Sequence, residues 1–569
     1  MKQLFIIPLL SLSAAATCMA AKPEAGKPFV TITQKGGKTL GYSPTSGVKI
    51  ITVDGLKFKD LNRNGKLDKY EDWRLPARER AIDLASQLSI EEIAGLMLYS
   101  AHQAIPANEQ GFGAGTYNGK PLSKSGAKAS DISDTQKKFL INDYLRHVLI
   151  TTVQSPRIAA EWNNNVQALC EGIGHGIPAN ITDLLRNKYA FDGVVCTDWM
   201  ITADVSGVSK FEGKCWGAEN LSVAQRHYEI LKAGVDQFGG NNDKEPVLKA
   251  YQMWKDEFGS ASARQRFESS AVRLLVNIFR TGLFENPYLD PNITSKTVGN
   301  PKYMQAGYDA QVKSIVMLKN HANVLPLKSK KLKVYVPKRF VKGVPDWWGN
   351  TPADKTEYPV DMNIVKKYYT VVDTPEAADF SLVFIESPNG GTGYSDEDAK
   401  QGGNGYVPIS LQYGKYTANT AREKSLAGGD TFEKTDNRSY KGKSTTAYNH
   451  TDAELVKLTH QQMHGKPVVV SVKCYKPCVL AEIEPYADAV VVDFETQAQA
   501  VLDIVSGKRE PSGLLPMQFP KDMLTVEAQK EDVSRDMTPY TDADGNSYDF
   551  AFGLNWKGKI SDWRTEKYK

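Results

Sequence analysis

Apolar side chains recur along the chain with two different spacings, and the two alternate. Residues 78–98 carry apolar side chains at helical intervals, and Ser89 with Glu92 forms the capping-box pattern that starts a second helix within this stretch. Helical spacing also covers residues 155–173, 181–190, 222–234 and 260–284, and apolar runs of strand length lie at 147–152, 191–199 and 235–240. Buried strands that alternate with helices are typical of an α/β architecture with parallel strands.

A second α/β region follows residues 285–292, whose Asn and Pro residues indicate a linker. Strands are predicted at residues 331–337, 380–386, 467–473 and 489–494, and helices near 450–464 and 496–506. Residues 388–450 are rich in Gly, Ser, Thr, Asn and Tyr. A connection of this length in a compact domain is usually functional, and a mobile surface insertion is the alternative.

The first 21 residues have the pattern of an export signal. Lys2 supplies a positive start, a short apolar run follows, and small residues provide the cleavage site. The apolar run is too short to span a membrane stably, and no later segment is long and apolar enough to do so. We therefore expect an exported protein, periplasmic or extracellular, without a membrane span. Cys18 as a lipid-anchor cysteine is the alternative, which residues 15–17 fit poorly.

Composition narrows the functional classes. The 569 residues suffice for two or three domains, and the formal net charge of +4 comes without any Lys/Arg run, so no nucleic-acid surface is predicted. After export five cysteines remain, an odd and sparse set that does not form a disulfide scaffold or a zinc motif. They are Cys170, Cys196, Cys215, Cys474 and Cys478. The last two are close enough in sequence for a local bridge or for two unrelated buried thiols.

Residues 58–76, "FKDLNRNGKLDKYEDWRLP", carry oxygen-bearing side chains at the spacing of an EF-hand calcium loop. Gly65 stands at position 6, where the loop turns sharply. The predicted Ca²⁺ ligands are Asp60, Asn62, Asn64, the Lys66 carbonyl, Asp68 and Glu71, at positions 1, 3, 5, 7, 9 and 12. We expect a structural metal clip, and a solvated Asn/Gly turn without metal is the alternative. Residues 542–546 look similar, but their glycine is misplaced and no Glu closes the loop, so they are predicted to be a turn.

The most informative chemistry lies in "YAFDGVVCTDWM", residues 189–200. A β-branched run ends in Thr197, Asp198 and Trp199, and groups at the carboxyl end of a parallel strand face the active-site mouth of α/β barrels. A carboxylate beside an aromatic ring suits a carbohydrate, because sugar faces stack on aromatics and a carboxylate can attack or stabilise an oxocarbenium-like centre. The alternative role for Asp198 is to cap a following helix.

This stretch resembles the nucleophile strand of glycoside hydrolase family three, the β-glucosidase-like enzymes. Residues 78–97 resemble the opening helix of that family, residues 271–288 its last barrel helix, and residues 314–328 the start of its second domain. "AVLDIVSGKREPSGLLPMQFP" and "FAFGLNW" resemble the closing motifs of the second domain. The resemblance implies a barrel-like first domain, an α/β sandwich second domain and retaining hydrolysis of β-linked glucosides or short β-glucans.

The resemblance also implies roles for individual residues. Asp198 corresponds to the nucleophile and Trp199 to an aromatic wall of the sugar site. The acid/base carboxyl comes from a loop of the second domain, where Glu386, Asp396, Glu397 and Asp398 all qualify. Glu386 is favoured because it follows its strand directly. No spacing argument separates the four.

The chain departs from the family pattern in the first domain. A (β/α)₈ barrel needs eight strands and typically about 250 residues, whereas about five candidate strands are recognisable here. Residues 174–180, "GHGIPAN", run at once into residues 181–199, and no Lys-His pair precedes Asp198. We therefore predict an α/β chain with an internal deletion. Its parts are a signal peptide (1–21), an N-terminal extension (22–76), an incomplete (β/α) barrel-like domain (77–290) and an α/β sandwich domain (300–569).

Two functions fit these observations. The first is an exported retaining β-glycosidase. The second is a non-catalytic or vestigial carbohydrate-binding protein, motivated by the missing barrel strands. A calcium-dependent adhesion or scaffold module built around residues 60–71 is a third class.

Overall fold

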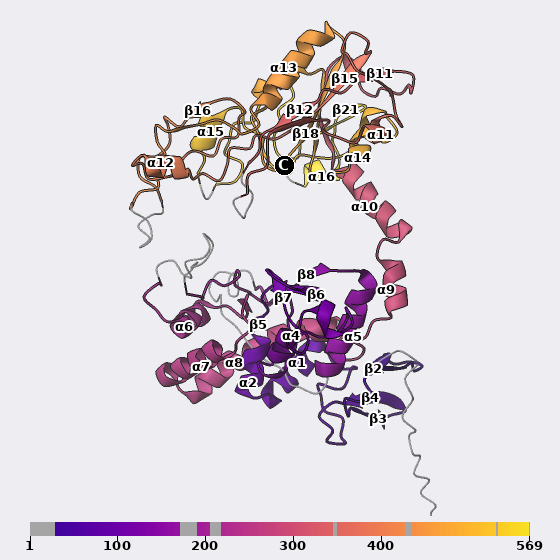
Figure 1. Ribbon diagram of the computed structural model, residues 1–569, viewed down its shortest axis with the longest axis vertical. Helices are drawn as coiled ribbons and strands as arrows, with labels where there is room; N and C mark the ends of the chain where they lie inside the picture. Colours follow the sequence, from indigo (N-terminus) through magenta and orange to yellow (C-terminus); the bar gives the residue numbers. More distant parts are fainter. Residues whose placement is uncertain are drawn as a thin grey trace, which may run out of the picture. The chain divides into compact units, whose positions relative to one another are not determined.

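The computed structural model describes residues 29–170, 190–204, 218–344, 350–426, 435–530 and 533–567. The predicted signal peptide, the "GHGIPAN" segment, most of the helix predicted at 181–190, Cys215 and the side chain of Cys170 lie outside the described part. The chain divides into two compact units, Met1–Gly299 and Asn300–Lys569. Both are drawn in Figure 1, and each is described by itself.

The first unit begins with two antiparallel hairpins in the N-terminal extension. β1 (Val30–Ile32) pairs with β2 (Leu40–Tyr42), and β3 (Lys49–Val53) pairs with β4 (Leu56–Asp60). A small apolar cluster that includes Val30, Tyr42 and Val48 holds them together. β4 ends at Asp60, the first residue of the predicted calcium loop, so the second hairpin leads directly into that loop.

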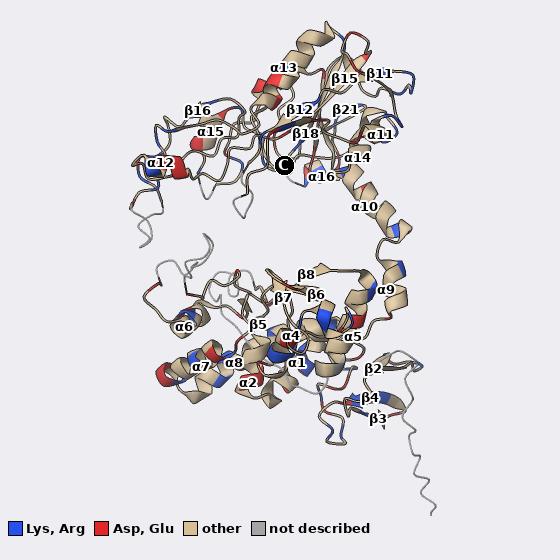
Figure 2. Ribbon diagram, in the orientation of Figure 1, with Lys and Arg blue, Asp and Glu red and all other residues tan. Residues whose placement is uncertain are grey.

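Helices form most of the core of the first unit. α1 (Ala77–Gln87) packs against α8 (Ser260–Arg280), α6 (Val223–Ala233) against α7 (Glu245–Phe258), and α7 against α8. The Ser89–Glu92 capping box at the start of α2 (Ile90–Leu96) is confirmed. α7 was not predicted. Figure 2 shows acidic and basic residues intermixed along the ribbon of α7, whose buried residues are limited to Val247 and Ala250.

Short parallel segments cross this core at the position of the predicted barrel strands. β5 (Leu98–Tyr99) pairs in parallel with β9 (Phe238–Gly239). Cys196 bridges Gln237 and Tyr99 bridges His147, both in parallel. Four neighbouring segments therefore lie in the order 195–197, β9, β5 and 147. In the structure, the strand predicted at residues 191–199 is limited to the single bridge at Cys196. Within the described residues, this segment has a strand partner on one side only.

A second small parallel sheet has the order β7 (Gly113–Ala114), β6 (Gln103–Asn108), β8 (Ile150–Val153). α3 (Leu122–Ser125), α4 (Asp134–Ile141), α5 (Pro156–Cys170) and α9 (Pro291–Thr297) complete the described helices of the first unit. The linker prediction for residues 285–292 is wrong. Asn164 on α5 donates to the Leu289 carbonyl (2.7 Å) and accepts from its N–H (2.8 Å), which ties this segment into the first unit.

The second unit is built on an eight-stranded sheet with the order β14, β11, β15, β18, β19, β10, β20, β21. Neighbours from β14 to β19 pair in parallel, and those from β19 to β21 antiparallel. The strand bounds are Thr370–Val372 (β14), Lys333–Tyr335 (β11), Phe380–Glu386 (β15), Val468–Lys473 (β18), Ala489–Asp493 (β19), Val316–Asn320 (β10), Leu554–Asn555 (β20) and Gly558–Lys559 (β21). The four strands predicted from apolar runs thus become β11, β15, β18 and β19.

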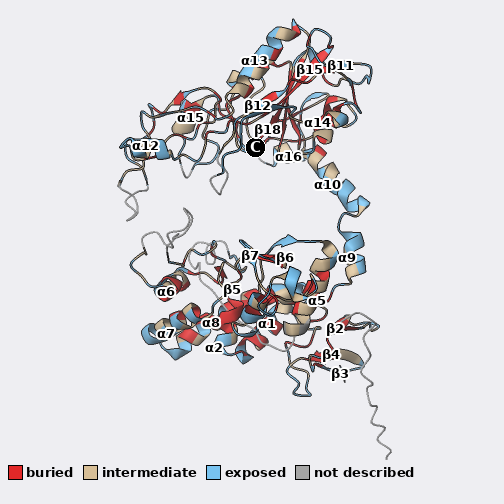
Figure 3. Cartoon of the chain, in the orientation of Figure 1, coloured by how far each residue is buried: buried red, intermediate tan, exposed pale blue. Residues whose placement is uncertain are grey.

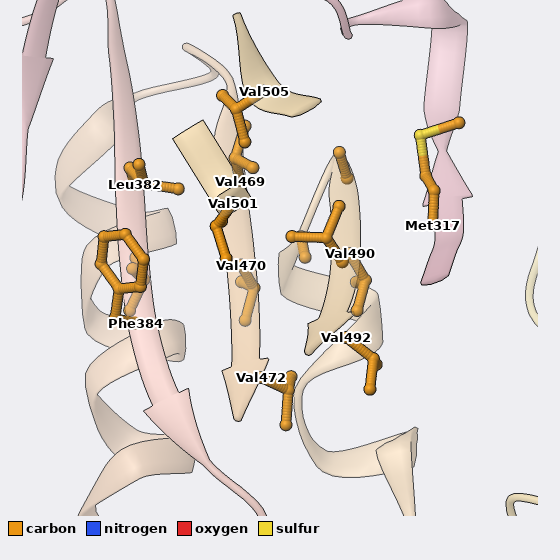
Figure 4. Packing of buried hydrophobic residues seen from close by; sticks show 14 of the residues in the cluster. Met317, Leu382, Phe384, Val469, Val470, Val472, Val490, Val492, Val501 and Val505 are labelled. Carbon is orange, nitrogen blue, oxygen red and sulfur yellow. The ribbon is translucent and has the colours of Figure 1, made fainter. Parts of the chain in front are cut away.

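Valines dominate the core of this sheet, since β-branched side chains pack well on both faces of a buried parallel sheet. Figure 4 shows Leu382 and Phe384 of β15 beside the valines of β18 and β19, with Val501 and Val505 of α14 (Ala498–Val505) over the same face. α10 (Pro301–Ser314) is largely exposed in Figure 3. The other described elements are α11 (Met362–Val365), β12 (Arg339–Val341), β13 (Lys355–Glu357), α13 (Thr451–Met463) and α16 (Trp563–Glu566).

The described part of residues 388–450 folds onto the second unit. It contains α12 (Asp396–Lys400) and the pair β16 (Tyr416–Thr417) and β17 (Ser444–Thr445). Tyr416 and Ala421 belong to a small core with Met523 of α15 (Met523–Glu527). This small core therefore holds the described residues of the segment on the second unit through apolar contacts.

Candidate functional site

Asp198 lies at the carboxyl end of the parallel segment 195–197. Its side chain is exposed, whereas the preceding Thr197 is buried and accepts the Gly239 N–H at its Oγ1 (2.8 Å). Asp198 Oδ1 accepts the Trp199 N–H at 2.7 Å. Residues 199–204 form turns rather than a helix, so the helix-capping alternative has no helix to cap within the described chain. An exposed carboxylate on a tethered strand end can reach a ligand.

A buried carboxylate holds the Asp198 segment in place. Asp236, which precedes β9, is fully buried, and its Oδ2 accepts the Val195 N–H at 2.8 Å. Its Oδ1 accepts from the Ser270 hydroxyl (2.6 Å) and faces Arg273 Nη1 (3.3 Å), both on α8. Asp236 therefore connects the Asp198 segment to the main helix of the first unit. Sequence reasoning missed this residue, although a single acidic residue inside the apolar segment 235–240 was a visible signal.

Trp199 forms part of an aromatic group beside Asp198. The Trp199 ring meets the Tyr99 ring edge-on at 4.9 Å, and His102 lies 6.4 Å away. Two glycines make room for it, because a Cβ on Gly239 would lie 3.0 Å from the indole and one on Gly240 2.9 Å from it. The buried indole N–H has no hydrogen-bond partner among the described residues. This ring is positioned to offer an apolar face next to a carboxylate.

Glu386 lies at the carboxyl end of β15, inside an ion-pair network of the second unit. Its Oε2 is 3.1 Å from Arg339 Nη2, and its Oε1 is 2.9 Å from Lys473 Nζ. Burial acts to raise the pKa of Glu386, but the two cations outweigh it and hold the pKa below its usual value. Arg339 also pairs with the buried Asp452 through two hydrogen bonds of 2.7 and 2.8 Å. A general acid needs a raised pKa, so this environment favours a structural ion-pair role for Glu386.

The other three acid/base candidates lie on α12. Asp398 pairs with Lys443 (2.5 Å), which lowers the pKa of its carboxyl. Asp396 and Glu397 are exposed, and Glu397 accepts a hydrogen bond from Gln401 at 2.6 Å. Glu397 is therefore free of cationic partners among the residues described here. Asp198 belongs to the first unit, and these carboxyls belong to the second unit.

A groove of about 590 Å³ lies on the second unit beside α15. Arg422, Arg438, Tyr440, Glu527 and Lys530 are among its lining residues. It contains neither Asp198 nor any acid/base candidate, so its residues receive no catalytic role. The predicted calcium ligands lie on one loop that begins at Asp60, the last residue of β4, and Asp60 and Glu71 are both buried.

Residues 315–556 match the model of the glycosyl hydrolase family 3 C-terminal domain. The chain is 31% identical over 359 residues to a probable beta-glucosidase C of Aspergillus flavus, which covers 63% of this chain and 46% of that protein. It is 25% identical to a periplasmic beta-glucosidase/beta-xylosidase of Dickeya chrysanthemi, with 90% of this chain and 95% of that protein covered. Residues 315–556 of this chain are thus similar to the C-terminal domain of glycoside hydrolase family 3.

The chain spans about half the length of the Aspergillus relatives that it matches. The alignment with the Dickeya protein runs over 697 positions, more than the 569 residues of this chain, so part of that protein stands opposite gaps here. A solved β-glucosidase structure from Erythrobacter marinus aligns with a TM-score of 0.46 and 15% identity, covering 86% of this chain and 84% of that one. In the described part of the chain, no helix has the length and apolar character that crossing a membrane requires.

Proposed function

We propose that this chain is a member of glycoside hydrolase family 3, an exported retaining β-glycosidase that acts on β-glucosides or short β-glucans with Asp198 as its nucleophile. The observation that carries the proposal is an exposed carboxylate at the end of a parallel segment, beside the Trp199 indole and anchored through Asp236. The names of the Aspergillus and Dickeya relatives support the substrate class. The match of residues 315–556 to the C-terminal domain of that family supports the reaction class.

In the proposed reaction the Asp198 carboxylate attacks the anomeric carbon of the sugar. The bond to the aglycone oxygen breaks as a second carboxyl donates a proton to it, which leaves a glycosyl ester on Asp198. Water then attacks the anomeric carbon, the second carboxyl takes its proton, and Asp198 leaves as carboxylate. The Trp199 ring stacks on the sugar face during both steps.

The second carboxyl is sought among residues 386–398. Glu386 is the first candidate by sequence position, and Glu397 is the exposed candidate that no described cation pairs with. The two are separated with a substrate whose leaving group needs no protonation. A variant that has lost the acid/base should release the aryl group from a 2,4-dinitrophenyl β-glucoside and then stall as the glycosyl ester. Added azide should rescue turnover and yield the glycosyl azide, and only the true acid/base variant, Glu386→Gln or Glu397→Gln, should show this rescue.

The nucleophile is tested with the full chain and a p-nitrophenyl β-glucoside. Asp198→Asn should lower turnover by at least about 1,000-fold, because no covalent intermediate can form. Asp192→Asn is the matched control, since Asp192 is an exposed carboxylate before the same strand segment, paired with Arg78 (2.7 Å). The control should retain activity. Loss of activity in both variants, or equal activity in both, would refute the assignment of Asp198.

The vestigial alternative also rests on a specific observation. The described parallel segments of the first unit number fewer than a closed barrel needs, and the Dickeya alignment contains gaps on this chain's side. Under this alternative the wild-type chain releases no aryl group, while calorimetry still detects binding of glucose or laminari-oligosaccharides. Absence of both turnover and binding would exclude the glycosidase and the carbohydrate-binding protein together.

A further inference from the structure

The loop that follows β4 is organised around carboxylate and amide oxygens. Asp60 Oδ2 accepts the Gly65 N–H at 3.1 Å, and Glu71 accepts the Leu61 N–H at Oε1 (2.7 Å) and the Asp68 N–H at Oε2 (3.1 Å). Gly65 has a φ of 78°, in the left-handed region that favours glycine. These contacts fold residues 60–71 into a closed turn with its first and last acidic residues on the inside.

One atom in this loop is left without a partner. Asp60 is fully buried, and its Oδ1 makes no hydrogen bond. Because Oδ2 of the same carboxylate is bound to the Gly65 N–H, the unpartnered oxygen is also held within the loop. A buried carboxylate oxygen without a donor is costly, and native proteins seldom leave one unmatched unless an ion or water takes that place.

The donors available to such an ion are oxygens of mixed type. The described residues contain no group of three or more His, Cys, Asp or Glu side chains already gathered at metal-binding distance. A group of that kind includes neither Asn amides nor main-chain carbonyls. Two of the six predicted donors are Asn amides, and one is a main-chain carbonyl. Asp68 Oδ2 accepts from the amides of Asn62 (2.6 Å) and Asn64 (2.8 Å), so the side chains at positions 3, 5 and 9 already meet.

We propose that residues 60–71 bind one Ca²⁺ ion and that this ion fastens the N-terminal hairpins to the helical core of the first unit. Six to seven oxygens from a flexible loop, closed by a bidentate Glu71, suit Ca²⁺. Mg²⁺ is smaller, requires a near-ideal octahedron and sheds water reluctantly, so it fits this donor set poorly. The proposal does not depend on the glycosidase activity.

The contacts around Tyr70 carry the effect of the ion into the core. The Tyr70 N–H donates to Asp83 Oδ2 on α1 at 3.1 Å, and Arg80 Nε of the same helix donates to the Tyr70 carbonyl at 2.9 Å. Arg80 also forms a buried ion pair of 2.6 Å with Glu285, just beyond α8. Ordering Glu71 therefore orders its neighbour Tyr70 and, through it, the contact between the extension and α1.

The experiment compares the full chain after chelator treatment with the same protein in Ca²⁺ or Mg²⁺. Calorimetric titration should show one Ca²⁺ site. At about 100 times the dissociation constant, Ca²⁺ should raise the melting temperature by roughly 5 °C. Limited proteolysis should also cut the extension, residues 29–76, more slowly in Ca²⁺. Mg²⁺ should produce less than a third of the shift.

Two variants decide whether the loop is responsible. Glu71→Gln should weaken Ca²⁺ binding at least about 100-fold and remove the shift, because the bidentate carboxylate is lost. Asp60→Asn should also remove the shift, yet melt no lower than the wild type without Ca²⁺, which shows that the variant is folded. Asp544→Asn, in the similar turn of the second unit, should keep the full shift. Lack of a Ca²⁺ response in the wild type, or a response that persists in both loop variants, would overturn the proposal.

Discussion

At the scale of single residues, the buried carboxylate of Asp236 has the clearest consequence. It accepts hydrogen bonds from the Val195 main chain and from Ser270 at the same time. In Asp236→Asn one oxygen becomes an amide that cannot accept, so one buried donor loses its partner. The free energy of unfolding of the first unit should fall by about 2 kcal/mol.

Urea unfolding measures this loss, and Asp192→Asn serves as the exposed control on the same segment. If the chain is active, kcat should fall while KM stays near the wild-type value, because Asp236 positions Asp198 without touching the sugar. An Asp236→Asn protein as stable as the wild type would contradict the anchoring role.

His227 gives the first unit a dependence on pH. It is buried against Phe238, with Nδ1 donating to the Val223 carbonyl (2.8 Å), and burial lowers its pKa from 6.5 to about 4. The folded state therefore binds fewer protons than the unfolded state between these values. The stabilisation is fully present above pH 6.5 and is lost as the pH falls toward 4, by on the order of 3 kcal/mol.

Urea unfolding at pH 7.5, 5.5 and 4.5 tests this expectation. The variant His227→Gln removes one titrating group and should reduce the slope of the stability profile of the first unit across this window, although it is less stable at neutral pH. Part of the slope should remain, because burial also lowers the pKa of His147 to about 4. An unchanged slope in the variant would show that other groups control the acid response.

At the scale of elements, the ends of β15 and β18 are held by charge. Glu386 at the end of β15 pairs with Lys473 at the end of β18 and with Arg339 on β12. Glu386→Gln removes the carboxylate that lies beside the buried Arg339–Asp452 ion pair. The second unit should lose about 2 kcal/mol of stability.

Glu397→Gln is the comparison for this prediction, because Glu397 is exposed on α12 and its loss should change stability by less than about 0.5 kcal/mol. Denaturant titration followed by near-ultraviolet circular dichroism distinguishes the two variants. Equal stabilities would mean that the network contributes little to holding the strand ends.

The same elements show what sequence reasoning can reach. The four strands β11, β15, β18 and β19 of the second unit and the Ser89–Glu92 cap were predictable, because continuous apolar runs and local capping chemistry depend on few distant partners. The anchoring by Asp236 and the pairing of Glu386 were not, since both depend on residues about 34 to 87 positions away. The predicted linker at 285–292 failed for the same reason, because the main chain of Pro287 and Leu289 is held by Asn163 and Asn164 of α5.

At the scale of the whole molecule, the two compact units should respond separately to changes within each. Differential scanning calorimetry of the full chain should resolve two transitions. Asp236→Asn should lower only the transition of the first unit and Glu386→Gln only that of the second, with additive effects in the double variant, because the residues share no described partner. A single transition that moves with either substitution would show one cooperative block.

The N-terminal hairpin has one further consequence for folding. Asp60 is at once the last residue of β4, opposite Lys49, and the first residue of the acidic loop. Sliding the hairpin by one residue would turn the Asp60 side chain to the opposite face of the ribbon and leave the loop without its inward carboxylate. Under the calcium proposal, a mispaired hairpin would lack the inward carboxylate that the ion needs, so Ca²⁺ would favour the correctly paired hairpin.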